Sequence, residues 1–258
     1  MTWDLCTIDW VAIGSVATGA MAIATFITLN NNKKQFKELQ RQSFENTLFQ
    51  LLHEVKKLLS EVSNIPPEGM RISGLTYGLQ ALESEYQTFK SFSTCKVDEN
   101  KNGDPIEIPI EPNYDNVKEA YIDIYHNMSN LGSYFRSLYR VIKYIDESNF
   151  TDEEKYQYTS FVRAQLTDIE LLWLFYNCKV GYGEEKFKPL VEKYSLLKNM
   201  PQTRLIHKNH LAWIKESAFK KDKSEIATEK KRCKIAKFFM ERKWFLKNKT
   251  IDKEITVQ

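Results

Sequence analysis

The sequence has 258 residues, of which 42% are hydrophobic and 28% charged, a composition that fits a folded protein and excludes a disordered chain. Glycine (9) and proline (7) are scarce, which disfavours a turn-rich β-sandwich and favours long helices. The four cysteines have no paired spacing, so neither a disulfide scaffold nor a CxxC-type zinc site is supported. The net charge is +3 at pH 7, and it is unevenly spread along the chain.

Residues 10–29 form a run of twenty residues without a charge, WVAIGSVATGAMAIATFITL. A helix of this length spans about 30 Å, the thickness of a bilayer's hydrocarbon core. Aspartates precede the run and lysines follow it, so the positive-inside rule places the N-terminus outside the cell. We expect residues 1–29 to be a short external N-terminus and a single transmembrane helix in the bacterial inner membrane, with residues 30–258 in the cytoplasm.

Other readings of this run stay open. A cleavable signal peptide would have a basic start, and this one is acidic, although Ala20-Met21-Ala22 mimics a cleavage site. A buried helix of a soluble core is a further alternative. Small residues four apart, such as Ser15 and Gly19, allow transmembrane helices to approach closely. We therefore expect membrane lipid and a second copy of the chain as partners.

Apolar residues at a spacing of three and four predict a long helix over residues 30–63 and a second over 75–92. Residues 93–114 contain three prolines and alternating isoleucines, which predict a loop excursion with a short strand or an extended arm. Helices are expected again over 117–128 and 134–145.

Thr151 and Thr167 each open a capping box that starts a further helix, and Gly181 and Gly183 end the second of these helices. The last predicted helices are a short pair over residues 186–200 and two more over 205–219 and 224–247. No internal repeat and no βαβ alternation is visible. The expected fold class is mainly α: a single N-terminal transmembrane helix followed by a multi-helix cytoplasmic domain with one extended loop insertion.

The C-terminal helices, residues 204–249, are basic, with fifteen Lys/Arg against five Asp/Glu. Nucleic-acid binding and contact with anionic lipid are two interpretations. The third is an amphipathic helix that packs its aromatic residues on the core and leaves its lysines in water. This third interpretation is favoured, lipid contact comes second, and nucleic acid is not favoured.

Several motifs of catalytic and binding sites are absent: the glycine-rich phosphate loop, HExxH and GxSxG. Of the four histidines, only His207 and His210 lie close together, and two ligands are too few for zinc. We therefore expect no cofactor and no metal, and the chain is more readily interpreted as a non-enzyme.

A set of polar residues lies within otherwise apolar predicted helices. A carboxylate among leucines and a tryptophan has to be paired or solvated, because burying it alone costs several kcal/mol. One hypothesis is a pocket for an anionic ligand such as a nucleotide signal; the other, which we favour, is an internal ion-pair network that fixes helix register. The set comprises Arg136, Arg140, Arg163, Gln165, Glu170 and Asn177.

Arg204 and His210 have the spacing R-x5-H, which resembles the R-x4-6-H element of the helical HEPN ribonucleases. In that family the two residues lie at a dimer cleft and act on RNA. The residue after the arginine is usually polar in the family, and here it is Leu205. A membrane-tethered HEPN-like ribonuclease that uses Arg204 and His210 is therefore the alternative function; otherwise the two residues lie on a solvated helix face.

Patches between about residue 44 and residue 200 resemble the phage abortive infection proteins of the AbiC-like group. The resemblance implies bacterial antiphage defence, in which an infected cell stops growing before the phage matures. It also implies a membrane segment followed by a helical body, and no agreed catalytic residues. We expect the chain to sense a phage or host trigger in the cytoplasm and to arrest growth at the inner membrane. The patches are FENTLFQLL at 44–52, YFR at 134–136, LYR at 138–140, RAQL at 163–166 with Glu170, LFYN at 174–177 and KFKPLVEKY at 186–194.

Overall fold

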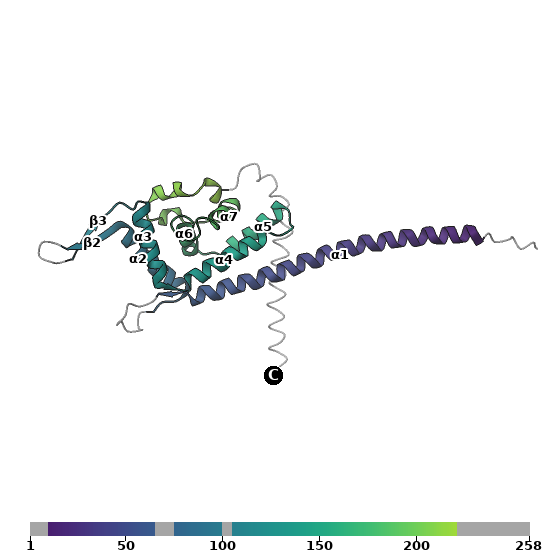
Figure 1. Cartoon of the computed structure of the whole chain (residues 1–258), viewed down its shortest axis with the longest axis horizontal. Helices are drawn as coiled ribbons and strands as arrows, with labels where there is room; N and C mark the ends of the chain where they lie inside the picture. The colour runs from purple at the N-terminus through teal and green to yellow at the C-terminus, as the bar shows by residue number, and fades with distance from the viewer. Residues whose placement is uncertain (1–9, 65–74, 100–104, 221–258) are drawn as a thin grey trace, which may run out of the picture. The chain divides into compact units, whose positions relative to one another are not determined.

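The computed structural model of the protein describes residues 10–64, 75–99 and 105–220 (Figure 1). The chain divides into two compact units, Met1–Gln50 and Leu51–Gln258, which are called unit 1 and unit 2 below. Each unit is considered by itself. The described part of the chain is mainly helical, as predicted.

Unit 1 contains the first part of the long helix α1 (Trp10–Glu61). Its side chains are described from Ala17 onward. No helix in the described ranges has a stretch long and apolar enough to cross a membrane. This finding corrects the fold class, in which residues 10–29 are a transmembrane helix. Small and hydroxyl-bearing residues such as Thr18, Gly19 and Thr25 make the described part of the run only moderately hydrophobic, whereas a spanning helix needs about 20 predominantly apolar residues.

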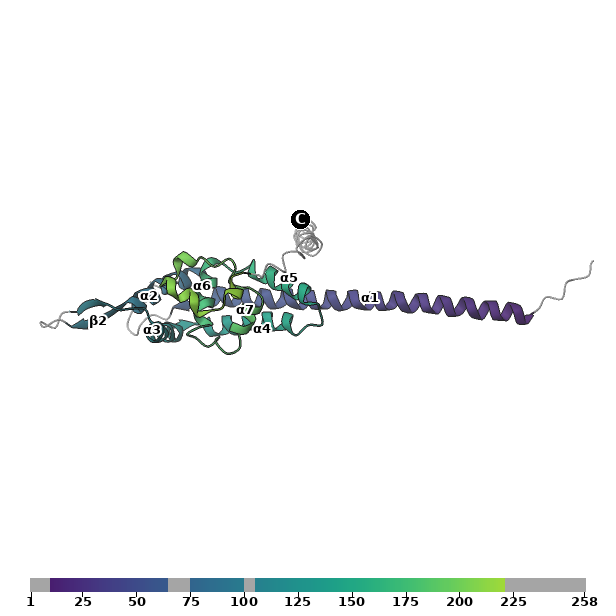
Figure 2. The ribbon, with the colours of Figure 1, turned by 90° about the horizontal axis from the view of Figure 1, so that it is seen from above.

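Unit 2 contains the rest of α1 and a set of shorter helices that pack around one another (Figures 1 and 2). Its α-helices after α1 are α2 (Gly78–Thr94), α3 (Tyr114–Asn127), α4 (Leu131–Asp146), α5 (Asp152–Arg163), α6 (Asp168–Asn177) and α7 (Lys188–Lys193). Its strands are β1 (Ser63–Asn64), β2 (Cys95–Glu99), β3 (Pro105–Pro109) and β4 (Met128–Ser129), and its short 3-10 helices are η2 (Gln202–Arg204), η3 (Lys208–Trp213) and η4 (Glu216–Ala218).

Helix α6 lies in the core of unit 2. It begins at the predicted capping box, in which Thr167 and Glu170 bond to each other's backbone N–H groups. Every residue from Ile169 to Asn177 is buried, so α6 is covered on all sides, as expected of a mostly apolar helix surrounded by others. Helices α2 and α3 pack against each other, and α2 also packs on α6.

The side chain of Trp173 joins α6 to its neighbours. It is fully buried, and its indole Nε1 donates a hydrogen bond of 3.0 Å to the backbone oxygen of Leu82 on α2. Its ring stacks on Phe89 of α2, with centroids 5.5 Å apart, and lies 5.8 Å from the ring of Tyr121 on α3. Because buried aromatic rings contribute large apolar areas, this cluster is a main source of stability for unit 2.

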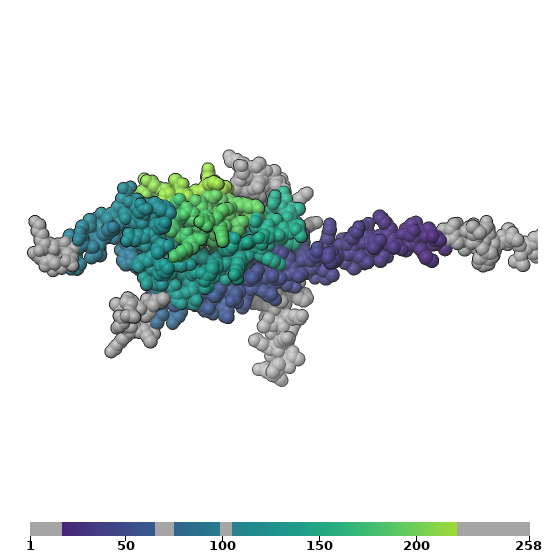
Figure 3. Space-filling model, in the orientation of Figure 1, coloured from purple at the N-terminus to yellow at the C-terminus, as the bar shows by residue number. Residues whose placement is uncertain are grey.

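The predicted excursion at residues 93–114 contains an antiparallel hairpin of β2 and β3, with Val97 paired to Glu107. In the space-filling view it stands out from the close-packed helices of unit 2 (Figure 3). Strands β1 and β4 form a second, two-residue pairing. At the start of α2, Gly78 has a φ of 58°, a left-handed conformation that favours glycine, and its N–H bonds to Val62.

The prediction of a helix over residues 205–219 is wrong. The chain forms the 3-10 helices η3 and η4 there, separated by extended residues. Leu205, Ile214 and Phe219 are buried. Their spacing suggests an α-helix, but short 3-10 helices and extended residues place them in the core instead. The predicted helix over 224–247 lies outside the described residues.

We predict that Trp173→Ala lowers the free energy of unfolding by about 3–5 kcal/mol, because it removes a buried aromatic side chain and leaves a cavity. Urea denaturation followed by circular dichroism measures the change. Phe92→Ala is the control, since Phe92 is 49% exposed, and we expect it to cost less than about 1 kcal/mol. Equal effects of the two substitutions would contradict the central position of α6.

Candidate functional site

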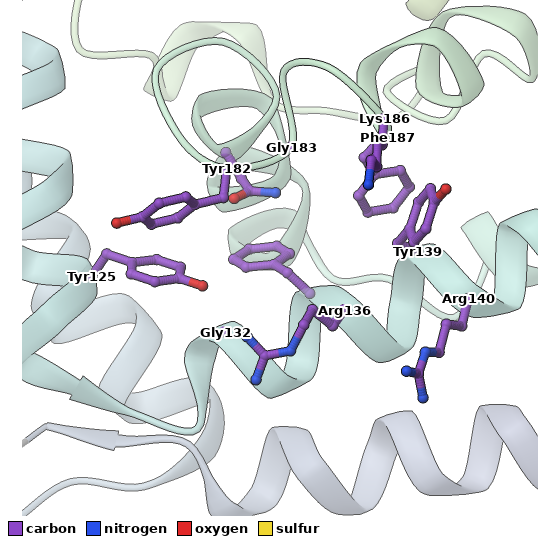
Figure 4. Close-up of a pocket in the computed structure, with 11 residues that line it drawn as sticks. Tyr125, Gly132, Arg136, Tyr139, Arg140, Tyr182, Gly183, Lys186 and Phe187 are labelled. Atoms are coloured by element: carbon purple, nitrogen blue, oxygen red, sulfur yellow. The ribbon is translucent and has the colours of Figure 1, made fainter.

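A pocket of about 530 Å³ opens on unit 2 between α3, α4 and the segment that joins α6 to α7 (Figure 4). Its volume lies within the range typical of small-molecule sites. The lining combines aromatic rings with three cations and contains no carboxylate. We call it the arginine pocket. Its lining residues are Tyr125, Gly132, Phe135, Arg136, Tyr139, Arg140, Asn177, Tyr182, Gly183, Lys186 and Phe187.

Both arginines lie on helix α4, which is strongly amphipathic. Tyr134 and Leu138 lie on its buried face. Arg136 and Arg140 are exposed and four residues apart, so they lie on one side of the helix. Of the six residues in the predicted polar set, these two arginines and Asn177 line the pocket.

Two pairs of aromatic rings lie at opposite ends of the pocket, with Arg136 between them (Figure 4). The rings of Tyr125 and Tyr182 are 4.8 Å apart, centroid to centroid. Those of Tyr139 and Phe187 are 5.6 Å apart. The rings are thus held by their own contacts as well as by the backbone.

Two glycines permit close approaches in the lining. A Cβ atom at Gly183 would lie 2.5 Å from Nδ2 of Asn177. A Cβ atom at Gly132 would overlap the hydroxyl of Tyr125 and lie 3.2 Å from Nη1 of Arg136. Any larger residue at these positions would therefore displace the polar groups of the pocket.

The cations of the pocket have few partners. Arg136 donates a hydrogen bond of 3.0 Å to the hydroxyl of Ser133. Within the described ranges, no salt bridge involves Arg136, Arg140 or Lys186. Two arginines at positions i and i+4 of a helix repel each other. The arrangement is suited to binding an anion, which would remove this repulsion.

Glu170, another predicted site residue, lies outside the pocket in a buried network. One carboxylate oxygen, Oε1, accepts hydrogen bonds from the hydroxyl of Tyr134 at 2.6 Å and from Nζ of Lys56 at 3.2 Å. The other, Oε2, accepts from the backbone N–H and the hydroxyl of Thr167, both at 2.8 Å. Lys56 also donates to the backbone oxygen of Gln165 at 2.6 Å. Both oxygens of the carboxylate are hydrogen-bonded, so Glu170 has a structural environment.

Arg163 does not pair with Glu170. Its guanidinium donates to the backbone oxygen of Ser195 at 3.1 Å and to the hydroxyl of Ser160 at 2.8 Å. It also lies over the ring of Tyr156, 5.8 Å from the centroid. The structure therefore separates the predicted set into pocket residues, the Glu170 network and a third environment around Arg163.

Arg204 and His210 occupy different environments. The guanidinium of Arg204 forms a salt bridge with Glu83, and this hydrogen bond lowers the pKa of the Glu83 carboxyl. The ring of His210 is buried and stacks on Trp213 with centroids 3.8 Å apart. The ribonuclease hypothesis stays a prediction, and no observation in the described part of the chain favours it.

The two ring nitrogens of His210 have partners that define its tautomer. Nε2 lies 2.7 Å from the backbone oxygen of Pro112, which can only accept, so Nε2 carries the proton. Nδ1 then accepts from the hydroxyl of Tyr176 at 3.0 Å, while the oxygen of that hydroxyl accepts from the N–H of Ile206. Burial lowers the pKa of His210, although the bond to Pro112 opposes this effect. His210 is thus a neutral structural histidine.

Sequence reasoning missed most of the pocket's aromatic residues and Lys186. Tyr182, Gly183 and Lys186 lie in a segment of successive turns without helical periodicity. The glycines at 181 and 183 were read only as a helix end. The tyrosine between two glycines, Gly181-Tyr182-Gly183, is the sequence signal that could have marked this segment. Within the described residues, no group of three or more His, Cys, Asp or Glu side chains is suited to hold a metal ion.

We predict that Glu170→Ala lowers the free energy of unfolding by about 3–5 kcal/mol, because it leaves the buried partners of the carboxylate unsatisfied. Glu170→Gln keeps the shape and some hydrogen bonds and should cost about 1–3 kcal/mol. Urea denaturation measures both values. Glu147→Gln, which affects an exposed pair with Lys143, should change stability by less than about 1 kcal/mol. A loss no larger than this control would refute the role of the network.

We predict a pH effect from His210. Its pKa is lower in the folded state, so the unfolded chain binds more protons as the pH falls through about 6.5. The contribution of His210 to stability is therefore present above that pH and is lost below it. Between pH 7.5 and 5.5, unfolding in urea should show a smaller loss of stability for His210→Gln than for the unchanged protein. Identical pH profiles would argue against a neutral, buried His210.

Part of the chain matches a known protein family. Residues 125–205 match the family described as "Putative phage abortive infection protein". No curated protein and no solved structure matches the chain. The matched segment begins at Tyr125 and includes every residue that lines the arginine pocket. The family resemblance predicted from the sequence patches is confirmed over this segment.

Proposed function

We propose that this chain acts in antiphage defence by abortive infection, and that it detects infection by binding a small anionic ligand in the arginine pocket. Binding would report infection to the part of the protein that arrests growth. The proposal combines the family match over residues 125–205 with the chemistry of the pocket within that same segment.

The observation that carries the proposal is the charge of the lining. Three cations, Arg136, Arg140 and Lys186, share one pocket that has no carboxylate. The chain has 34 Asp and Glu against 37 Lys and Arg, so carboxylates are available elsewhere to pair with cations. A concave surface of one sign of charge concentrates counter-ions of the opposite sign. An anionic ligand is therefore the species that this pocket favours most.

The shape of the pocket supports a small ligand. Aromatic rings at both ends and Phe135 between them provide apolar surface, and a few polar groups are placed among them. This combination of mostly apolar walls with a few oriented polar groups is typical of sites for small molecules. A flat basic surface, in contrast, is typical of proteins that follow a nucleic-acid backbone.

We predict that the double substitution Arg136→Glu/Arg140→Glu abolishes protection against phage, because the reversed charges repel an anionic signal. Protection is measured as the efficiency of plating of a phage panel on cells that express the protein. The matched control is Lys90→Glu/Lys198→Glu, which changes the net charge equally at two exposed lysines outside the pocket. Protein abundance and melting temperature are measured for both variants.

The control variant should protect as well as the unchanged protein. Full protection by the pocket variant would overturn the proposal that infection is sensed there. A failure of the unchanged protein to protect against every phage of the panel would overturn the defensive role itself.

A further inference from the structure

The arginine pocket contains two chemically different parts, and their arrangement restricts the kind of anion that it fits. The first part is the Tyr125–Tyr182 pair at one end of the pocket. The second is the set of cations on α4 and on the segment before α7. In Figure 4 the two tyrosines face the space beside Arg136, while Arg140 and Lys186 lie farther along the pocket.

The three cations of the arginine pocket come from two separate elements. Arg136 and Arg140 are four residues apart on α4, which separates their Cα atoms by about 6 Å along the helix axis. Lys186 approaches from a different element. Guanidinium groups recognise phosphate through pairs of hydrogen bonds. A chain of phosphate groups would engage successive cations, whereas a single phosphate or carboxylate would leave at least one of them without a partner.

The tyrosine end suits a planar ring. The side chain of Tyr182 is 61% exposed although it lies in the pocket lining. Its ring is held by contact with Tyr125, at 4.8 Å, and its hydroxyl lies 3.3 Å from Nε2 of His126. A fixed and exposed aromatic ring is a stacking platform for a nucleobase, and such stacking accepts any base.

Asn177 adds a polar group to this end of the pocket. The residue is only 3% exposed. Its Oδ1 accepts a hydrogen bond of 3.0 Å from the hydroxyl of Tyr121. Among the described residues no acceptor pairs with its Nδ2, so one amide donor of this residue is left for a ligand. A ring nitrogen or a carbonyl oxygen of a base is an acceptor of the required kind.

We infer that the ligand of the arginine pocket is a free nucleotide with two or more phosphates. Its base stacks on Tyr182 and accepts a hydrogen bond from Asn177, and its phosphates contact Arg136, Arg140 and Lys186. This inference rests on the proposed function and adds the chemical class of the ligand. Because the cations themselves neutralise the phosphates, binding does not require a divalent metal ion.

Isothermal titration calorimetry on the full-length protein in EDTA tests the inference. The ligands are ATP and GTP, tripolyphosphate, adenosine, and a short 5′-hydroxyl oligoribonucleotide. We expect at least one nucleoside triphosphate to bind about tenfold or more tightly than tripolyphosphate, since stacking of one base contributes about 1–3 kcal/mol. Adenosine and the oligoribonucleotide should bind more weakly than that nucleotide.

Two substitutions separate the base from the phosphates. Tyr182→Leu should lower the affinity for the nucleotide to that for tripolyphosphate and leave tripolyphosphate binding unchanged. Arg140→Ser should lower the affinity for both. Both residues are exposed, so we expect the melting temperatures of the two variants to stay within a few degrees of that of the unchanged protein. This measurement is the control for folding.

The outcomes distinguish this inference from the proposed function. Equal affinities for nucleotides and tripolyphosphate would overturn base recognition and leave the anion site intact. Tight binding of the oligoribonucleotide alone would contradict the inference of a free nucleotide and would indicate that the ligand is a nucleic acid. Binding of none of the phosphate-containing ligands would overturn both the nucleotide and the anion site.

Discussion

The buried carboxylate of Glu170 is the constraint on which the arrangement of unit 2 depends. It closes the capping box of α6, accepts a hydrogen bond from Tyr134 of α4, and pairs with Lys56 of α1. A buried carboxylate is costly unless its oxygens are hydrogen-bonded. All of these partners are therefore needed at the same time, and only one placement of α6 against α4 and the C-terminal turns of α1 provides them.

The position of α4 determines what the arginine pocket can contain. Tyr134 fixes the rotation of this helix through its bond to Glu170, and Leu138 continues the buried face. With that face directed into the core, the helical period places Arg136 and Arg140 on the outer side. The C-terminal end of α6 supplies Asn177, and the turns that follow it supply Tyr182 and Lys186. The internal network and the external pocket are thus two sides of one contact between α4 and α6.

Local signals in the sequence predicted the local features of this fold. The capping boxes at Thr151 and Thr167 were readable because donor and acceptor lie three residues apart. The pairing of Glu170 was not, since Lys56 lies 114 residues away. The separation of Arg163 from Glu170 was not readable either, since α5 ends at Arg163, α6 starts at Asp168, and Arg163 donates to Ser195 and Ser160 instead. The transmembrane prediction for residues 10–29 was wrong, since no helix among the described residues is long and apolar enough to cross a membrane; the length and the lack of charge of a run do not make it apolar when alanine, glycine and threonine are frequent in it.

The contrast between the two groups of charges is informative about function. At Glu170 the chain satisfies one carboxylate with a lysine, a tyrosine and a threonine. At the arginine pocket the same helix, α4, carries two arginines for which the described residues provide no carboxylate. A sequence that is nearly balanced in charge could have paired these cations as it pairs Lys143 with Glu147 on that helix. The stability lost through their repulsion is small, a few tenths of a kcal/mol for an i, i+4 pair, and an anion that binds between them would recover it. An anionic ligand would therefore supply the negative charge that the lining of the arginine pocket does not contain.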